Sequence, residues 1–465
     1  MSLLSDAHYP SLAEITDGYA NGSLRPSDVV KAHLDRIERL DSTIGAFQAV
    51  YAEEAMSQAE AADQMLATGA RLGPFHGIPF GLKDICDVEG RVTTGGSMVF
   101  KDRVSPSTCA LAHRLFEAGG IMIGKTKTVE FALGGWGTNQ KMGTPRNPWD
   151  MSVHRVPGGS SSGTGAGTAA GMIVCGVGTD TGGSVRLPAG YCGLVGLKVT
   201  EGQLPTEGIL PLSDTLDTPG PLARSVEDAL LMYLSMKGAE GWRVDRHRRD
   251  ATGPFADLKR GVQGMRLGVL DGTERAVCSV DVLEAYDAAL DRLRHAGAEL
   301  VVFSARQPYA DLTATCGLLI VAEGYFHHGH LYEQDDLPLD EDVRTRMLVG
   351  RDVLAVDYIQ LLKDRLAAQD AYLKRMKGLD ALLTPTMTST APPIDVVDQS
   401  IAPSHFTRHV NYFGMCALSM PSGLGKDGLP TSLQVIARPN EEATVLRIGA
   451  AFEALQPPLP LPMLS

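Results

Sequence analysis

Apolar residues recur at helical spacing close to the start of the chain. In PSDVVKAHLDRIERL, residues 26–40, positions 29, 30, 34, 37 and 40 are apolar, which predicts a helix with one buried face. Ser27 can cap this helix ahead of Asp28. We therefore predict that residues 1–70 form an N-terminal helical segment.

Farther along the chain, helical and strand-like patterns alternate. Residues 110–126, ALAHRLFEAGGIMIGKT, predict a helix, a Gly-Gly stop and a short strand, and similar patterns return across 265–304. A longer helical pattern covers 341–377 and is followed by the strand-like DALLTPT of 380–386. Alternation of this kind is typical of βαβ units. We therefore predict an α/β fold, in which helices cover both sides of a central, mixed and twisted sheet.

Small residues are concentrated between 158 and 183, where GTGAGTAAGMIVCGVGTDTGG predicts a helix packed closely against a strand, and then a tight loop. A close helix–strand contact alone would account for the glycines. It would not account for the serines and threonines at both ends, in PGGSSSG (157–163) and GTDTGGSVRLPAG (178–190). These two stretches are therefore candidates for catalytic chemistry.

Ser184 is the candidate nucleophile, because it directly follows two glycines. The glycines leave the backbone N–H groups of Thr181, Gly182, Gly183 and Ser184 uncovered, which predicts an oxyanion cradle for a developing negative charge. A serine hydroxyl needs a base to take its proton. Neither serine-rich stretch contains a histidine, so the base must come from elsewhere in the chain.

Two residues are candidates for this base. His154 is the only histidine between Trp136 and Ser184, but its polar surroundings, WDMSVHRV, are more typical of a surface loop. Lys83 follows the apolar GIPFGL, where desolvation would lower the pKa of its ammonium group towards neutrality. The alternative for Lys83 is a surface ion pair with Asp84. If Lys83 is the base, the Asp84 carboxylate must point away from its nitrogen.

Three stretches resemble the motifs of the amidase signature family of serine hydrolases. GIPFGLKD resembles the family's lysine motif, PGGSSSG the stretch that supplies a bridging serine, and GTDTGGSVRLPA the nucleophile motif. The order Lys83, Ser160, Ser184 and the spacings of 77 and 24 residues also match. The resemblance implies a Ser–cis-Ser–Lys triad, joined by a chain of hydrogen bonds, in which Ser184 attacks the carbonyl, Ser160 relays its proton and Lys83 accepts it. Three further residues are expected to support the triad by hydrogen bonds: Ser161, Asp180 and Arg186.

The resemblance covers nearly the whole chain and implies one amidase domain over residues 1–465. After the N-terminal segment, we predict a catalytic core at 71–237 and a more variable lobe of helices and βαβ units at 238–377. The C-terminal part of the core is assigned to 378–465. The implied reaction is cleavage of a C–N bond in a small amide, anilide, carbamate or urea, with water as the second substrate.

The substrate pocket is expected beside this triad. By the resemblance, the loop FALGGWGTN (131–139) covers the acyl side, where Trp136 is either a stacking wall or a core anchor. Tyr191 and Cys192 follow the nucleophile loop and would line the opposite wall. EGYFHHGH, with Tyr325, Phe326, His327 and His328, is either a lid or a plain surface helix or loop. The candidate pocket residues are Gly134, Gly135, Trp136, Tyr191 and Cys192.

Three other functions are considered. GSSSG fits the nucleophile elbow of α/β-hydrolases with Ser161 at its centre, but Pro157 and two glycines make a poor preceding strand. A non-catalytic binding subunit would be favoured by loss of a triad residue, yet all three are present. A glutaminase subunit of a tRNA-dependent amidotransferase would share the fold, but Leu187 stands where those subunits usually carry a polar residue. A stand-alone amidase is therefore favoured.

Composition and charge narrow the remaining classes. The net charge is −13, and the basic run RVDRHRRD (243–250) is flanked by acidic residues, so we expect no nucleic-acid partner. No apolar run reaches the roughly 18 residues of a membrane span, and the N-terminus does not resemble a signal peptide. Seven dispersed cysteines without a CxxC pair predict buried thiols in the cytoplasm. We expect no metal, no cofactor and a monomer or homodimer.

Overall fold

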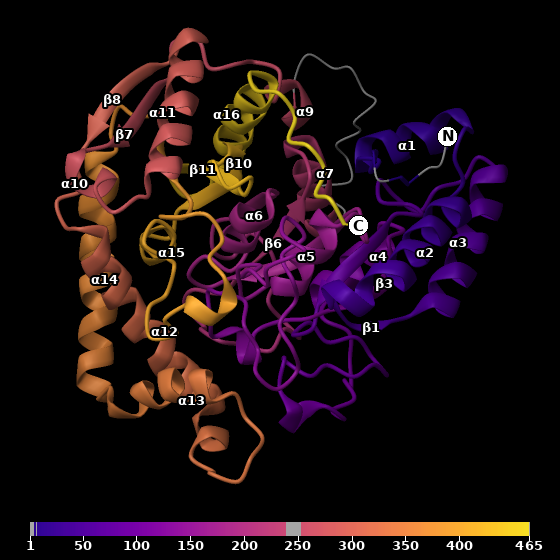
Figure 1. Cartoon of the computed structure of the whole chain (residues 1–465), viewed down its shortest axis with the longest axis horizontal. Coiled ribbons are helices and arrows are strands. Elements are labelled where there is room, and N and C mark those ends of the chain that lie inside the picture. Colours follow the sequence, from indigo (N-terminus) through magenta and orange to yellow (C-terminus); the bar gives the residue numbers. More distant parts are fainter. Residues whose placement is uncertain (1–3, 6, 239–252, 465) are drawn as a thin grey trace.

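The computed structural model describes residues 4–5, 7–238 and 253–464. Within these residues, eleven strands form one mixed sheet (Figure 1). From one edge to the other, the strands are β1 (Phe47–Val50), β3 (Ile121–Thr126), β2 (Pro79–Lys83), β4 (Cys175–Asp180), β6 (Thr218–Ala223), β5 (Val195–Lys198), β10 (Cys416–Leu424), β11 (Pro430–Ala437), β9 (Ala381–Pro385), β7 (Arg266–Leu270) and β8 (Glu299–Phe303).

Helices from all parts of the described chain surround this sheet. They are α1 (Leu12–Asn21), α2 (Pro26–Ile44), α3 (Ala52–Ala67), α4 (Ala110–Glu117), α5 (Ser162–Ala169), α6 (Arg186–Cys192), α7 (Val226–Met236), α9 (Pro254–Asp257), α10 (Gly272–Arg275), α11 (Val280–His295), α12 (Tyr309–Tyr332), α13 (Glu341–Leu348), α14 (Ala355–Arg375), α15 (Arg408–Tyr412) and α16 (Glu442–Ala454). Figure 1 shows α1–α3 at one end of the molecule and β7, β8 and α10–α14 at the other.

Both faces of the central sheet are covered. Every residue of β2, β4, β9 and β11 is buried, and successive side chains of a strand point to opposite faces. Helices α5 and α6 pack together and against β4 and β5, while α7 and α16 pack together and against β6 and β10. The α/β fold with a mixed, helix-covered sheet is therefore confirmed.

The parallel part of the sheet positions the candidate site. Strand β2 is parallel to both β3 and β4, so β2 and β4 end at the same edge. Lys83 is the last residue of β2 and Asp180 the last of β4. In open α/β sheets, this carboxyl edge of the strands is where ligands bind.

Segments with clear periodicity fold as predicted. The helix expected at 26–40 is α2, although it begins at Pro26 with Arg25 in the capping position. Ser27 is thus not its cap, and its hydroxyl donates instead to Asp63 Oδ2 at 2.5 Å. The helix and strand expected at 110–126 are α4 and β3. The βαβ pattern of 265–304 forms the parallel pair β7 and β8 with α11 between them.

Two helical regions differ from the prediction. The tract at 341–377 is divided into α13 and α14 by a short 3-10 helix, Val349–Asp352. For the 24-residue helix α12, the sequence offered only the alternative of a surface helix or loop at EGYFHHGH, within the lobe expected at 238–377. The boundary expected at residue 238 adjoins residues 239–252, which lie outside the described part of the chain, as does the basic run 243–250. The proposed division into segments stays a prediction.

The cysteines agree with the expectation of buried thiols, apart from one. All seven cysteines are free; Cys278 is partly exposed and the other six are buried. In the described part of the chain, no helix combines the length and the apolar character that a membrane crossing requires.

Candidate active site

The two serine-and-glycine stretches lie next to each other. PGGSSSG leads into α5, and GTDTGGSV joins β4 to α6. The Ser161 N–H donates to the Ser184 carbonyl oxygen at 3.4 Å. The Ser161 hydroxyl accepts from the Thr179 N–H at 3.3 Å, with the Thr179 carbonyl oxygen at 3.4 Å. Ser161 therefore connects the two stretches. The peptide bond between Gly159 and Ser160 is cis, the conformation that the resemblance implied.

Lys83 lies directly beneath these stretches. Its side chain is completely buried, and its Nζ donates to Ser160 Oγ at 2.8 Å and to Thr179 Oγ1 at 2.7 Å. Burial lowers the pKa of this amine to about 7, although nearby groups that include Asp217 act to raise it. A substantial fraction of Lys83 is therefore neutral at physiological pH, and a neutral amine can accept a proton.

The Asp84 carboxylate is engaged by residues other than Lys83. It accepts hydrogen bonds from Lys125 Nζ at 3.3 Å and from the Thr94 N–H at 3.1 Å. Burial raises the pKa of Asp84, while Lys125 and Thr94 lower it. Because Lys83 and Asp84 are both buried, the alternative of a surface ion pair between them is wrong.

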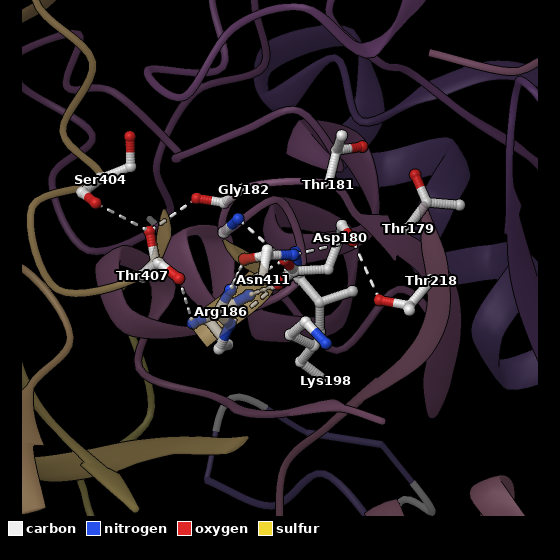
Figure 2. Close-up of polar contacts among 12 residues, drawn as sticks. Thr179, Asp180, Thr181, Gly182, Arg186, Lys198, Thr218, Ser404, Thr407 and Asn411 are labelled. Atoms are coloured by element: carbon white, nitrogen blue, oxygen red, sulfur yellow. Dashed lines mark hydrogen bonds and ion pairs between the residues drawn. The ribbon is translucent and has the colours of Figure 1, made fainter. Parts of the chain in front are cut away.

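Asp180 and Arg186 form a buried ion pair under the nucleophile loop (Figure 2). Arg186 Nε and Nη2 donate to Asp180 at 3.0 and 2.9 Å, and Asn411 Nδ2 donates to it at 2.9 Å. Burial alone would raise the pKa of Asp180, but Arg186 and its other partners hold that pKa well below its usual value. The same carboxylate accepts the N–H groups of Gly183 at 2.8 Å and Val185 at 3.2 Å. This pair therefore determines the shape of the loop.

The backbone around Ser184 leaves part of the predicted oxyanion cradle open. The Gly183 N–H donates to Asp180. Gly183 is therefore not a free donor, whereas the sequence predicted that it would be one. The N–H groups of Thr181, Gly182 and Ser184 donate no hydrogen bond to any described residue. A side chain at Gly183, where φ is 133°, would collide with Thr407. The loop therefore requires glycine here.

The Ser184 hydroxyl faces a cavity rather than a protein partner. Ser184 is 7% exposed and lines a cavity of about 220 Å³. Among the hydrogen bonds of the described residues there is none between the hydroxyls of Ser160 and Ser184, so only the Lys83–Ser160 half of the expected chain of contacts is present. Ser184 is nevertheless held beside Ser160 by the backbone contact with Ser161.

One predicted wall of the cavity is present and the other is not. Gly134, Gly135 and Trp136 line it. The Trp136 indole N–H donates to the carbonyl oxygen of residue 401 at 2.8 Å, which anchors the ring to the opposite loop. Tyr191 and Cys192 are not among the residues that line this cavity, and each is 1% exposed. Tyr191 lies behind Trp136, with ring centroids 6.3 Å apart. The expectation that they form a wall is therefore corrected.

The opposite wall comes from parts of the chain that motif analysis did not reach. Helix α12 contributes Gly317, Leu318, Ile320 and Val321, and the segment before α15 contributes several polar groups. Two cationic side chains also line the cavity: Arg346 and Arg408. Neither arginine lies near a recognisable motif, so no signal in a single sequence could have selected them.

The EGYFHHGH segment is part of α12 rather than a lid. Phe326 is 78% exposed, whereas the His328 ring stacks on Phe131 at a centroid distance of 4.2 Å. His327 Nε2 lies 3.1 Å from Asp214 Oδ2. None of these residues lines the cavity of Ser184.

Two rival catalytic centres find no support in the geometry. His154 is partly exposed, with Nε2 3.4 Å from the Pro145 carbonyl oxygen, and does not line the cavity. Ser161 is fully buried and follows a loop rather than a strand, unlike the serine of a nucleophile elbow. No group of three or more His, Cys, Asp or Glu side chains among the described residues could hold a metal ion.

Comparisons with known proteins agree along nearly the whole chain. A family profile described as Amidase matches residues 28–446. The chain is 34% identical to one of the subunits of the glutamyl-tRNA(Gln) amidotransferase of Geobacter metallireducens, over 95% of this chain and 96% of that protein. It is also 34% identical to a 2-amino-5-chloromuconic acid deaminase of Comamonas testosteroni, over 97% of each. A crystal structure of an amidase superposes with a TM-score of 0.86 at 30% identity, covering 96% of this chain and 99% of that one.

Proposed function

This chain belongs to the amidase signature family of hydrolases, which act on carbon–nitrogen bonds, and from that premise we propose that it cleaves a small amide-type substrate through an acyl-enzyme on Ser184. The observation that carries the proposal is the contact between Lys83 Nζ and Ser160 Oγ at 2.8 Å, beside the cavity that Ser184 lines. It joins a largely desolvated amine to the hydroxyl best placed to relay a proton.

The proposed reaction has two steps. Neutral Lys83 takes the proton of Ser160, which takes that of Ser184, while Ser184 Oγ bonds to the substrate carbonyl carbon. The C–N bond then breaks, and the proton held by Lys83 returns through Ser160 to the leaving nitrogen. Water attacks the resulting ester by the same proton route, which releases the carboxylic acid and regenerates Ser184.

Backbone donors are proposed to stabilise the tetrahedral intermediate. The N–H groups of Thr181, Gly182 and Ser184 have no partner among the described residues, so they are available to an oxyanion in the cavity. Gly183 would contribute only if its hydrogen bond to Asp180 were exchanged. Asp180, Arg186 and Ser161 are proposed to position the loop by the hydrogen bonds described above.

We favour a stand-alone amidohydrolase over a glutaminase subunit. The amidotransferase subunit and the deaminase named above are equally identical to this chain, so identity alone does not choose between the two functions. The cavity supports the choice: apolar groups, Leu187 among them, line it together with polar and cationic side chains, but no Asp or Glu lines it to receive the ammonium group of glutamine. Amides, anilides, carbamates and ureas small enough for about 220 Å³ are the proposed substrates.

A fluorophosphonate probe tests this proposal. We expect it to label purified enzyme at Ser184, located by mass spectrometry, because a fluorophosphonate captures an activated serine. Ammonia or amine should be released from simple amides by the chain alone, without other subunits. Absence of both labelling and hydrolysis would favour a non-catalytic binding protein instead.

Chelators should leave the activity unchanged. The proposed chemistry uses a lysine and two serines and requires no metal ion. We expect the same kcat/KM before and after exhaustive treatment with EDTA or phenanthroline. An activity that falls on chelation and returns when a metal ion is added would contradict this mechanism.

Asp217→Asn should shift the pH dependence of kcat/KM. The Asp217 carboxylate raises the pKa of Lys83. Without this carboxylate, Lys83 should lose its proton at a lower pH, and the rise of kcat/KM with pH should begin at a lower pH. Asp217 also accepts the N–H groups of Leu212 and Ser213 at 2.8 and 3.0 Å, so the melting temperature should fall as well. Asp214→Asn is the control: Asp214 is exposed and lies close to Asp217 in the sequence, and its replacement should leave the pH dependence of kcat/KM unchanged.

A further inference from the structure

The cavity of Ser184 contains a guanidinium group that the proposed reaction does not use. Arg408, the first residue of α15, lines this cavity. Its side chain lies against the nucleophile loop: a Cβ at Gly182 would stand 3.1 Å from Arg408 Cγ and 3.4 Å from its Nε. Within the described residues, its guanidinium makes one hydrogen bond, from Nη1 to the Thr313 carbonyl oxygen at 3.1 Å. The other N–H groups are available to a ligand.

No acidic group in the described chain neutralises Arg408. The cavity lining contains no Asp or Glu. Burial lowers the pKa of Arg408, and no carboxylate contributes in the opposite direction. The guanidinium still remains protonated at neutral pH. Arg408 is partly buried, and a partly buried cation without an anionic partner is less favourable than a paired one, so an anionic ligand in the cavity would stabilise it.

A second guanidinium adds to the positive charge of the cavity. The Nη1 and Nη2 groups of Arg346 donate to the carbonyl oxygens of Gln399 at 2.8 Å and Leu133 at 2.9 Å, while its buried Nε has no hydrogen-bond partner among the described residues. Burial lowers the pKa of Arg346, the carboxylates of Asp340 and Asp342 raise it, and Arg408 lowers it further. The two cations therefore interact. Two nitrogens of Arg346 are held by the wall, whereas Arg408 makes one hydrogen bond and has more donors available to a ligand.

We propose that Arg408 binds a carboxylate of the substrate and thereby selects small amides that carry a net negative charge. This inference rests on the proposed function, because the selected molecule is the one that Ser184 would cleave. A planar guanidinium can hold a carboxylate through two parallel hydrogen bonds. Since the cavity measures about 220 Å³, the carboxylate and the scissile carbonyl belong to one short molecule.

The same lining disfavours an amino-acid amide. A substrate ammonium group would need an anionic acceptor, whereas the polar side chains of the wall include the neutral Thr181, Gln399 and Ser404. An ammonium group would also be repelled by the two guanidinium groups. The substrate class is therefore the monoamide of a dicarboxylic acid, without an amino group beside the carboxylate.

Three amides of the same chain length test this class. Glutaramate carries the carboxylate, glutamine adds an ammonium group next to it, and pentanamide has a methyl group in its place. We expect wild-type kcat/KM, measured as ammonia release, to be about 10- to 100-fold higher for glutaramate than for the other two amides. This is the size of effect expected for the gain or loss of a hydrogen bond to a charged group.

Variants assign this preference to Arg408. Arg408→Gln should reduce the ratio of kcat/KM for glutaramate to that for pentanamide by about 10- to 100-fold. Arg408→Lys should restore part of the ratio, because it keeps the charge and loses the paired geometry. Arg351→Gln is the matched control: Arg351 is exposed, does not line the cavity, and should leave the ratio at its wild-type value.

The outcomes separate this inference from the proposed function. Equal turnover of glutaramate and pentanamide, or an unchanged ratio in Arg408→Gln, would overturn the inference while hydrolysis at Ser184 stands. Labelling of Ser184 by the fluorophosphonate without turnover of glutaramate would also overturn the inference alone. The absence of both labelling and hydrolysis would overturn the proposed function and the inference together.

Discussion

Replacing Ser184 with alanine is expected to lower kcat/KM for every amide substrate by about 10⁴- to 10⁶-fold, because only substrate binding and the oxyanion donors would remain. The melting temperature should stay close to that of the wild type. Ser184 Oγ makes no hydrogen bond with the described residues and faces the cavity, so its loss leaves no buried partner unsatisfied. Ammonia release and thermal unfolding measure the two effects.

Ser400→Ala is the matched control for this variant. Ser400 also lines the cavity, but its hydroxyl donates to Asp398 Oδ1 at 2.6 Å and has no part in the proposed reaction. Its kcat/KM should change far less than that of Ser184→Ala. If both variants kept wild-type kcat/KM, Ser184 would not be the nucleophile.

Replacing Lys83 with methionine is expected to cost about 10²- to 10⁴-fold in kcat/KM, the usual contribution of general acid–base catalysis. The methionine side chain is unbranched and similar in length to that of lysine, but it cannot accept the proton of Ser160. In the wild type, kcat/KM should rise with pH through an apparent pKa of about 7, because only neutral Lys83 serves as the base. The profile should then stay high into the alkaline range, and the variant should lose this limb.

Stability provides an independent readout of the same lysine. Its pKa is about 7 in the folded state against 10.5 for an unperturbed lysine, so between these values the unfolded chain binds one more proton. The contribution of Lys83 to stability therefore rises with pH across this window and is least favourable below pH 7. Lys83→Met should flatten this dependence in denaturant titrations.

A histidine variant excludes the other candidate base. His154→Ala should keep both the wild-type activity and the pH limb, because His154 does not line the cavity. A Lys83→Met enzyme that kept wild-type kcat/KM and the same limb, together with a His154→Ala enzyme that lost both, would assign the base to His154.

The chemistry of the candidate site could be predicted because its signals are local. Ser184 follows two glycines, which indicates an oxyanion cradle, and Lys83 follows the apolar GIPFGL, which makes it a candidate for a desolvated amine. The choice of Lys83 as the base and the role of Ser160 came from the resemblance to the amidase signature family. Periodicity was equally informative for α2 and β3, whose buried faces recur at regular spacing. Helix α12 gave no clear signal because apolar residues occur on its exposed side as well as on its buried side: Leu318 and Phe326 are exposed, although 11 of the 24 residues are buried.

The sequence by itself therefore determined the fold class, the three candidate catalytic residues and the family. Only the tertiary structure decided what surrounds Ser184, because the wall of its cavity is assembled from segments that are distant in the chain. Arg408 lies against Gly182 although 226 residues separate them. Tyr191 and Cys192, by contrast, follow the nucleophile closely and yet point into the protein. Distance along the chain carries no information about such contacts, which depend on how the sheet orders its strands and where α12 and α15 pack.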